Sequence, residues 1–203
     1  MWLISSFFPR SRIATNALVL SEKFGSSNQK PLLYNNHFLG TGHLDSYHLN
    51  ASQLRKGFAS GLSSGDAGPA FNCASIATHF SIISAEKDLT SLLKEIDYYL
   101  LLLETYKSEL AKKFILCYRE TVSTLIDRGE TTGIDGKSSC IDDESADPGE
   151  GNKLQGVFYF HQMFRNHWLG YTERSHHYAQ KALPCMKHGP FGTALIHRFY
   201  YGK

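Results

Sequence analysis

The sequence predicts an all-α fold in which antiparallel helical hairpins stack as a right-handed solenoid. Apolar residues recur at spacings of three and four over most of the chain from residue 51 onward, which is the period of a helix with one buried face. Glycines and short polar links separate these stretches, and short links make consecutive helices antiparallel neighbours. One hairpin cannot bury its apolar face alone, so stacking is needed to form a continuous core.

The composition is that of a globular protein with a balanced charge. The 203 residues are 42% hydrophobic and 20% charged, with 21 basic and 19 acidic side chains. This balance gives no indication of a nucleic-acid or membrane-surface partner. The longest clean apolar run, near residues 98–103, is far below the ~18 residues of a membrane span. The four cysteines are widely spread without a CxxC motif, which favours reduced thiols and a cytoplasmic location.

Residues 1–50 are poorly patterned. Arg10 and Arg12 precede the first acidic residue, Glu22, as in a presequence for import into an organelle. The alternative is a short amphipathic helix after Pro9, followed by a second short helix that opens at Pro31. An organellar location is therefore the alternative to a cytoplasmic one.

Residues 51–127 form the first predicted part of the helical repeat. Leu54, Phe58 and Leu62 share one face of the first helix, which Gly65 is predicted to end in the left-handed conformation. Asp66 is predicted to cap the next helix through its side chain. That helix carries a stripe of small residues that allows a close helix contact: Ala70, Ala74, Ala77 and Ser81.

The strongest helical period of the chain follows Asp88. It predicts a long amphipathic helix whose apolar positions are Leu89, Leu92, Leu93, Ile96, Tyr99, Leu100 and Leu103. A further helix, ending by Gly129, completes this part.

Residues 128–151 are predicted to be a disordered acidic loop, because acidic and small polar residues cannot bury enough apolar surface to offset chain entropy. The second part of the repeat, residues 152–203, begins with an aromatic-rich helix. A helix over 171–186, despite Pro184, and another over 191–201 follow. The chain then ends without a polar cap, so we expect this part to be truncated.

No catalytic, cofactor-binding or metal-ligating residue is predicted. A phosphate-binding loop around Gly136-Lys137-Ser138 would need glycine at position 131, where Thr131 stands. The adjacent His176 and His177 point about 100° apart on a helix, and the zinc motifs HExxH and CxxC are missing. We therefore expect a protein that is not itself an enzyme and holds no cofactor.

Three segments together resemble a known region. They are GFASGLSSGD at residues 57–66, LKEIDYY at residues 93–99, and the hairpin from Gly170 to Lys181-Ala182-Leu183. They resemble the tetratricopeptide-like (TPR-like) helical array of large multidomain signal-transduction ATPases linked to kinase or cyclase modules. The resemblance covers about three quarters of the chain, from Leu54 to Lys203. Gln162 and Asn166 depart from the repeat consensus, and the ATPase domain's own motifs have no counterpart.

The resemblance implies a non-catalytic segment that binds a protein or a neighbouring domain and regulates a signalling ATPase. We expect a partner groove lined by exposed polar and aromatic residues, with Tyr98, His161, Asn166 and Tyr171 as its candidates. One alternative is a fragment of an ATP-binding signalling enzyme, an ATPase or protein kinase, whose catalytic domain lies outside this chain. The other is a helical adaptor imported into an organelle.

Overall fold

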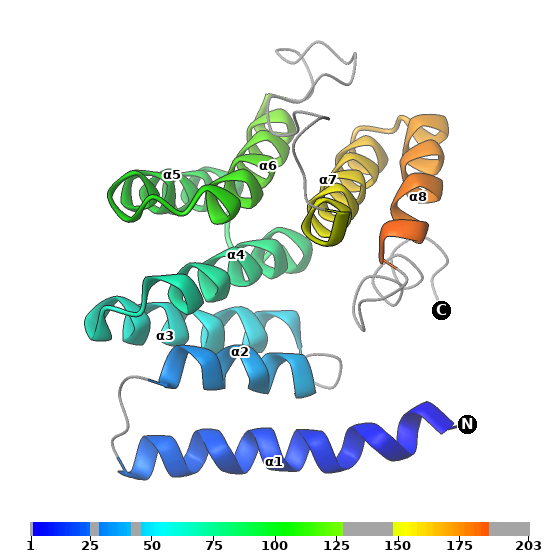
Figure 1. Cartoon of the computed structure of the whole chain (residues 1–203). Helices are drawn as coiled ribbons and strands as arrows, with labels where there is room; N and C mark the ends of the chain where they lie inside the picture. The colour runs from blue at the N-terminus through cyan, green and yellow to red at the C-terminus, as the bar shows by residue number, and fades with distance from the viewer. Residues whose placement is uncertain (1, 25–28, 42–45, 128–147, 187–203) are drawn as a thin grey trace. The chain divides into compact units, whose positions relative to one another are not determined.

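A computed structural model describes residues 2–24, 29–41, 46–127 and 148–186, and within these ranges the protein is all-α (Figure 1). Consecutive helices pack as antiparallel pairs, which confirms the predicted fold class at this level. None of the described helices combines the length and apolar character needed to cross a membrane. The helices are α1 (Trp2–Phe24), α2 (Lys30–Thr41), α3 (Tyr47–Ser64), α4 (Ala67–Ser84), α5 (Leu89–Tyr106), α6 (Glu109–Ile126), α7 (Pro148–Trp168) and α8 (Thr172–Met186).

The chain divides into two compact units. The first comprises residues 1–88 and 104–111 and contains α1 to α4. The second comprises residues 89–103 and 112–203 and contains most of α5 and α6 together with α7 and α8.

Several helices begin earlier than the sequence pattern suggests. α1 is a 23-residue helix that includes Pro9, rather than a short helix that follows it. α3 begins at Tyr47, because the Ser46 hydroxyl accepts a hydrogen bond from the Leu49 amide at 3.2 Å and so caps the helix. α7 begins at Pro148, a residue suited to the first helical turn, so residues 148–151 of the expected acidic loop are helical. Residues 128–147 and the expected helix over 191–201 lie outside the described residues.

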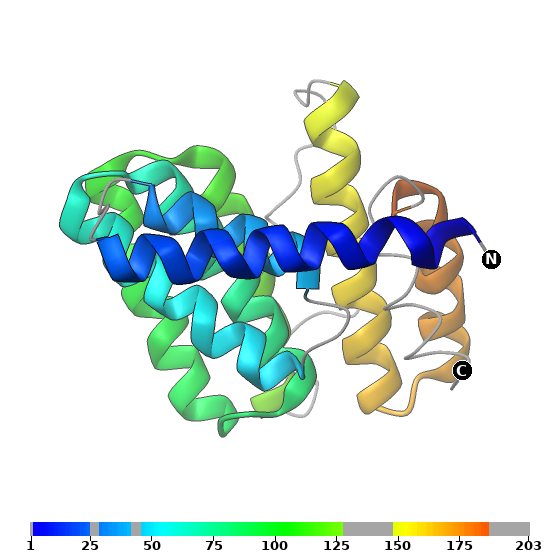
Figure 2. The ribbon, with the colours of Figure 1, turned by 90° about the horizontal axis from the view of Figure 1, so that it is seen from below.

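Two helices at the N-terminal end of the first unit are joined by a hydrogen bond. Figure 2 shows α1 crossing in front of α2 and α3. Among the residues of α1 whose burial is described (12, 13 and 15–24), Leu18 and Ser21 are buried. From α2, the Tyr34 hydroxyl donates to Glu22 Oε1 at 2.9 Å. Burial and the adjacent Glu22 carboxylate raise the pKa of Tyr34 to about 12.

The turn between α3 and α4 largely follows its prediction. Gly65 adopts the left-handed conformation (φ 76°), and the Asp66 amide donates to the Gly61 carbonyl at 2.9 Å, as in a Schellman turn. Asp66 precedes α4 as expected, but its side chain makes no capping hydrogen bond, so that part of the prediction is wrong. Its ψ angle of 71° departs from the extended backbone that normally aims an N-cap side chain at the free amides.

α3 and α4 approach each other closely through small residues. Ala70, Ala74, Ala77 and Ser81 are all fully buried, as the stripe of small residues predicts. On α3, a Cβ atom at Gly61 would lie 2.6 Å from the Ala70 Cβ, and one at Gly57 would lie 2.9 Å from Cys73 Sγ. The absence of a side chain at these two glycines is therefore what allows the contact.

Gly61→Ala is expected to lower the free energy of unfolding by about 1–3 kcal/mol, because the added methyl group would overlap the Ala70 side chain and approach its backbone. Alanine is a better helix former than glycine by roughly 1 kcal/mol. The variant is therefore destabilised only if the packing penalty exceeds this gain in helix propensity. Gly68→Ala is the matched control, since nothing lies within 4 Å of a Cβ there. Urea denaturation measures both; a Gly61→Ala protein as stable as Gly68→Ala would contradict the close contact.

Aromatic side chains fill the core of the first unit. The Phe38 and Phe80 ring centroids lie 5.0 Å apart, and those of Phe58 and Phe71 lie 5.7 Å apart. The Phe71 side chain is fully buried, and its ring centroid lies 5.5 Å from that of Tyr106 in an edge-to-face arrangement.

His79 lies in this core, 5.3 Å from the Phe80 ring centroid and 8% exposed. Burial lowers its pKa from the ordinary 6.5 to about 4, because desolvation disfavours the imidazolium form. Between these values the unfolded chain binds a proton that the folded chain does not.

The free energy of unfolding is therefore expected to fall by up to ~3 kcal/mol through His79 as the pH drops from about 7 to 4. Urea denaturation across this range measures the slope, and His79→Gln is expected to flatten it. The exposed His176 supplies the control, His176→Gln, which is expected to keep the parental slope. Equal slopes for the parent and His79→Gln would contradict a neutral buried imidazole.

In the second unit α5 and α8 each bury one face, whereas part of α7 is buried on all sides. On α5, the buried side chains are Leu92, Ile96, Tyr99 and Leu103. On α8, the close-packing residues predicted from the hairpin pattern, Ser175, Ala179 and Ala182, are all buried, and the Ser175 hydroxyl donates to the Met163 carbonyl of α7 at 3.0 Å. On α7, all residues from Phe160 to Asn166 are buried.

Candidate partner-binding surface

The structure separates the four residues predicted to line a groove. Tyr98 on α5 is 51% exposed and Tyr171, just before α8, is 38% exposed. His161 and Asn166 on α7 are 1% and 5% exposed, so their predicted exposure is wrong. The four side chains therefore do not share one solvent-facing surface.

The burial of His161 and Asn166 has a local cause. The His161 ring lies against Tyr118 of α6, with centroids 4.8 Å apart. The Asn166 side-chain amide donates to the Gln162 carbonyl at 2.6 Å, which satisfies a polar group inside the unit. Neighbouring Arg165 Nη1 donates to Glu120 Oε1 of α6 at 2.7 Å. His161 and Arg165 thus join α7 to α6.

A different surface gathers aromatic and basic residues along α8. Tyr171, Arg174, Tyr178 and Lys181 follow each other at spacings of three, four and three, which places them along one side of the helix. We call these four residues the α8 stripe. Arg174 and Lys181 are exposed, and Tyr178 is half-buried.

Cation–π contacts order the α8 stripe. Arg174 Cζ lies 5.7 Å from the Tyr171 ring centroid. Lys181 Nζ lies 5.7 Å from the ring centroid of Tyr159, on α7, and 5.9 Å from that of Tyr178. The two tyrosine rings are 6.4 Å apart and inclined by 27°. Each such contact contributes about 0.5–1 kcal/mol at an exposed site, which limits the conformational freedom of the Arg174 and Lys181 side chains.

Of the four residues of the α8 stripe, only Tyr171 is among the candidates predicted from the sequence. Arg174, Tyr178 and Lys181 are present in the hairpin that resembles a TPR unit, but the consensus draws attention to its small residues instead. Trp168, at the end of the aromatic-rich helix α7, is 64% exposed. The signal that could have located the surface is the alternation of tyrosine with a cation at helical spacing.

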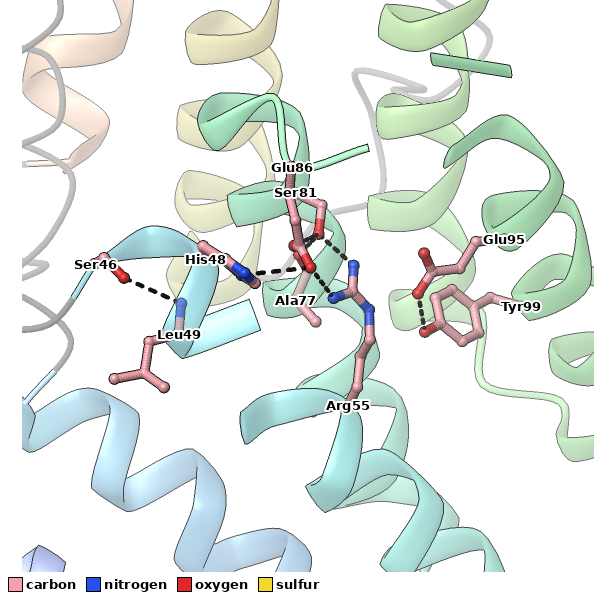
Figure 3. A network of polar contacts seen from close by, with 9 residues as sticks. All are labelled: Ser46, His48, Leu49, Arg55, Ala77, Ser81, Glu86, Glu95 and Tyr99. Carbon is pink, nitrogen blue, oxygen red and sulfur yellow. Dashed lines mark hydrogen bonds and ion pairs between the residues drawn. The ribbon is translucent and has the colours of Figure 1, made fainter. Parts of the chain in front are cut away.

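The first unit contains a separate polar cluster, shown in Figure 3. Arg55 of α3 donates to Glu86 Oε1 at 2.9 Å and to the Ser81 hydroxyl of α4 at 2.6 Å. His48 Nδ1 lies 3.6 Å from the same Glu86 oxygen. The Ser81 hydroxyl also donates to Glu86 Oε2 at 3.2 Å. Ser81 thus contacts an arginine and a carboxylate rather than an imidazole base, so the cluster lacks the order of a nucleophilic triad. The cluster joins α3 to α4 and to Glu86, which follows α4 in the sequence.

The cysteines and acidic residues do not form a metal site in the described part of the chain, where no group of three metal-binding side chains occurs. Burial raises the pKa of Cys73 to about 12, which keeps its thiol protonated and unreactive. Its Sγ donates to the Pro31 carbonyl at 3.3 Å.

Comparison with protein-family models, with curated protein sequences and with solved structures found no match to this chain.

Proposed function

We propose that the protein is a non-catalytic helical scaffold that binds an acidic segment of a protein partner along the α8 stripe. The observation that carries this proposal is the row of tyrosine and cationic side chains along α8, in which the exposed Arg174 and Lys181 contact tyrosine rings. Tyrosine and arginine are enriched at the centres of protein interfaces, because they offer large contact areas and directional polar groups.

The charge on α8 favours an acidic partner. The helix carries Arg174 and Lys181 on the stripe, whereas its one acidic residue, Glu173, lies about 100° around the helix from Arg174. Carboxylates on a partner would pair with the two cations, and an apolar side chain between them would pack against Tyr178.

The wider role that we propose is that of a TPR-like repeat that regulates a signalling ATPase. It is supported by the residues of the hairpin and of the two segments that resemble such arrays, together with the packing of consecutive antiparallel helices. A groove for a neighbouring domain is the usual use of stacked helical hairpins.

Selection from a library of random peptides displayed on phage tests the proposal. We expect the full chain to enrich peptides in which Asp or Glu flank an aromatic or large aliphatic residue. Arg174→Glu/Lys181→Glu is expected to weaken the selected peptides at least tenfold in fluorescence anisotropy, because like charges would then face each other.

Lys56→Glu/Lys94→Glu is the matched control, since it changes the net charge equally at two exposed lysines on α3 and α5. It is expected to keep the parental affinity. Enrichment of peptides without acidic residues, or equal weakening by both double variants, would exclude the α8 stripe as the binding surface.

A further inference from the structure

The outer face of α1 is an exposed apolar stripe. Ile13, Ala17, Leu20 and Phe24 follow each other at spacings of four, three and four, so they lie along one side of the helix. Ile13 is 69% exposed, Leu20 53% and Phe24 74%. The stripe extends over about 17 Å at the helical rise per residue.

The charges of α1 are distributed unequally around this apolar stripe. Glu22 lies on the side opposite Ile13, where it accepts the hydrogen bond from Tyr34 of α2. Arg12 and Lys23 lie about 80–100° from the stripe, on its flank, and Lys23 Nζ is 5.8 Å from the Phe24 ring centroid. The charged side chains on the outward side of residues 12–24 are therefore all positive, although the whole chain is nearly neutral.

From this arrangement we infer that α1 docks on the surface of an anionic lipid bilayer, lying parallel to it. Helices that bind in this way insert an apolar face at the level of the acyl-chain boundary while flanking lysine and arginine side chains reach the headgroups. The stripe lies along one side of a single helix, so a flat, deformable surface can contact its whole length.

A second copy of this chain fits the face less well than lipid does. Self-association through a two-fold axis would bring the same patch of each copy together. If the two helices pair antiparallel, Arg12 and Lys23 of one copy face the same cations of the other, and like charges at an interface oppose association. Negative headgroups instead neutralise both cations, at a gain of about 1 kcal/mol for each.

Co-sedimentation of the full chain with lipid vesicles tests this inference. We expect binding to vesicles of phosphatidylcholine that contain phosphatidylglycerol, little binding to phosphatidylcholine alone, and weaker binding at high salt. Leu20→Ser/Phe24→Ser is expected to lower the partition coefficient at least tenfold, because two large apolar side chains no longer enter the bilayer. Arg12→Glu is expected to lower it about fivefold or more.

Leu32→Ser, at an exposed leucine of α2, is the matched control and is expected to bind like the parent. Circular dichroism checks that each variant keeps its helical content. The inference is overturned if the parent does not bind anionic vesicles, or if Leu20→Ser/Phe24→Ser binds as well as the parent. It is also overturned if the parent instead forms dimers that this variant abolishes, or if only Arg174→Glu/Lys181→Glu prevents lipid binding.

Discussion

Leu92→Asp is expected to lower the free energy of unfolding by about 5 kcal/mol or more, because it combines a cavity in the core with an unpaired buried charge. Leu92 is fully buried on α5. Domains of this size are typically stable by about 5–15 kcal/mol, so a loss of this size removes much or all of the folded population at ambient temperature. Thermal and urea denaturation followed by circular dichroism measure the loss.

Two further leucines of α5 provide the controls. Leu101 is 66% exposed, so Leu101→Asp is expected to change the stability by no more than about 0.5 kcal/mol. Leu93 is half-buried, and Leu93→Asp is expected to fall between the other two. If Leu92→Asp melts like Leu101→Asp, the assignment of the buried face of α5 is wrong.

The same helix shows what helical spacing can and cannot predict. The sequence placed seven apolar residues between Leu89 and Leu103 on one broad face, and the structure buries only Leu92, Ile96, Tyr99 and Leu103. These four are spaced by four, three and four and occupy one half of that face. Leu89, Leu93 and Leu100 occupy the other half, about 50–90° from the middle of the buried half. Periodicity locates the face, whereas the position of the neighbouring helices decides how wide its buried part is.

Polar residues were harder to place than apolar ones. His161 and Asn166 have side chains that are exposed in most proteins, so their types favoured a surface position. They are buried because other residues contact them inside the unit. Tyr118, which is distant in the sequence, packs on His161, and the Gln162 carbonyl of the same helix accepts a hydrogen bond from Asn166. The Arg55–Glu86 pair joins residues 31 positions apart, and no local motif indicates such a contact.

The candidate surfaces were missed for a related reason. The α8 stripe and the exposed face of α1 depend on which side of a helix remains uncovered, and a helical pattern alone does not say which neighbours exist. On α1, the sequence indicates an amphipathic helix after Pro9, but it does not say which side of that helix remains uncovered. The bond between Glu22 and Tyr34 of α2 then fixes which side faces outward.

Arg165→Met is expected to destabilise the protein by about 3 kcal/mol, because it leaves the Glu120 carboxylate without its cation in a largely buried place. The two side chains are 10% and 23% exposed and their bond joins α7 to α6. We place the loss at the lower end of the range for buried pairs because Glu120 keeps some contact with water. Urea denaturation of Arg165→Met measures this loss.

The double variant Arg165→Met/Glu120→Leu separates the attraction between the charges from the penalty of stranding one of them. It is expected to recover most of the stability lost in Arg165→Met, since replacing both members of a buried pair by apolar residues is often neutral. A double variant as unstable as the single one would show that Arg165 acts through its packing rather than through its charge.

The Arg119–Asp97 pair between α6 and α5 is the natural comparison. Its nitrogen–oxygen distance is also 2.7 Å, but its side chains are 45% and 48% exposed. Arg119→Met is therefore expected to cost no more than about 1 kcal/mol, because water screens the pair and solvates whichever partner remains. Two ion pairs of equal length in one unit should thus differ about threefold or more in their effect on stability. If the two single variants lose equal stability, burial does not control the strength of these pairs.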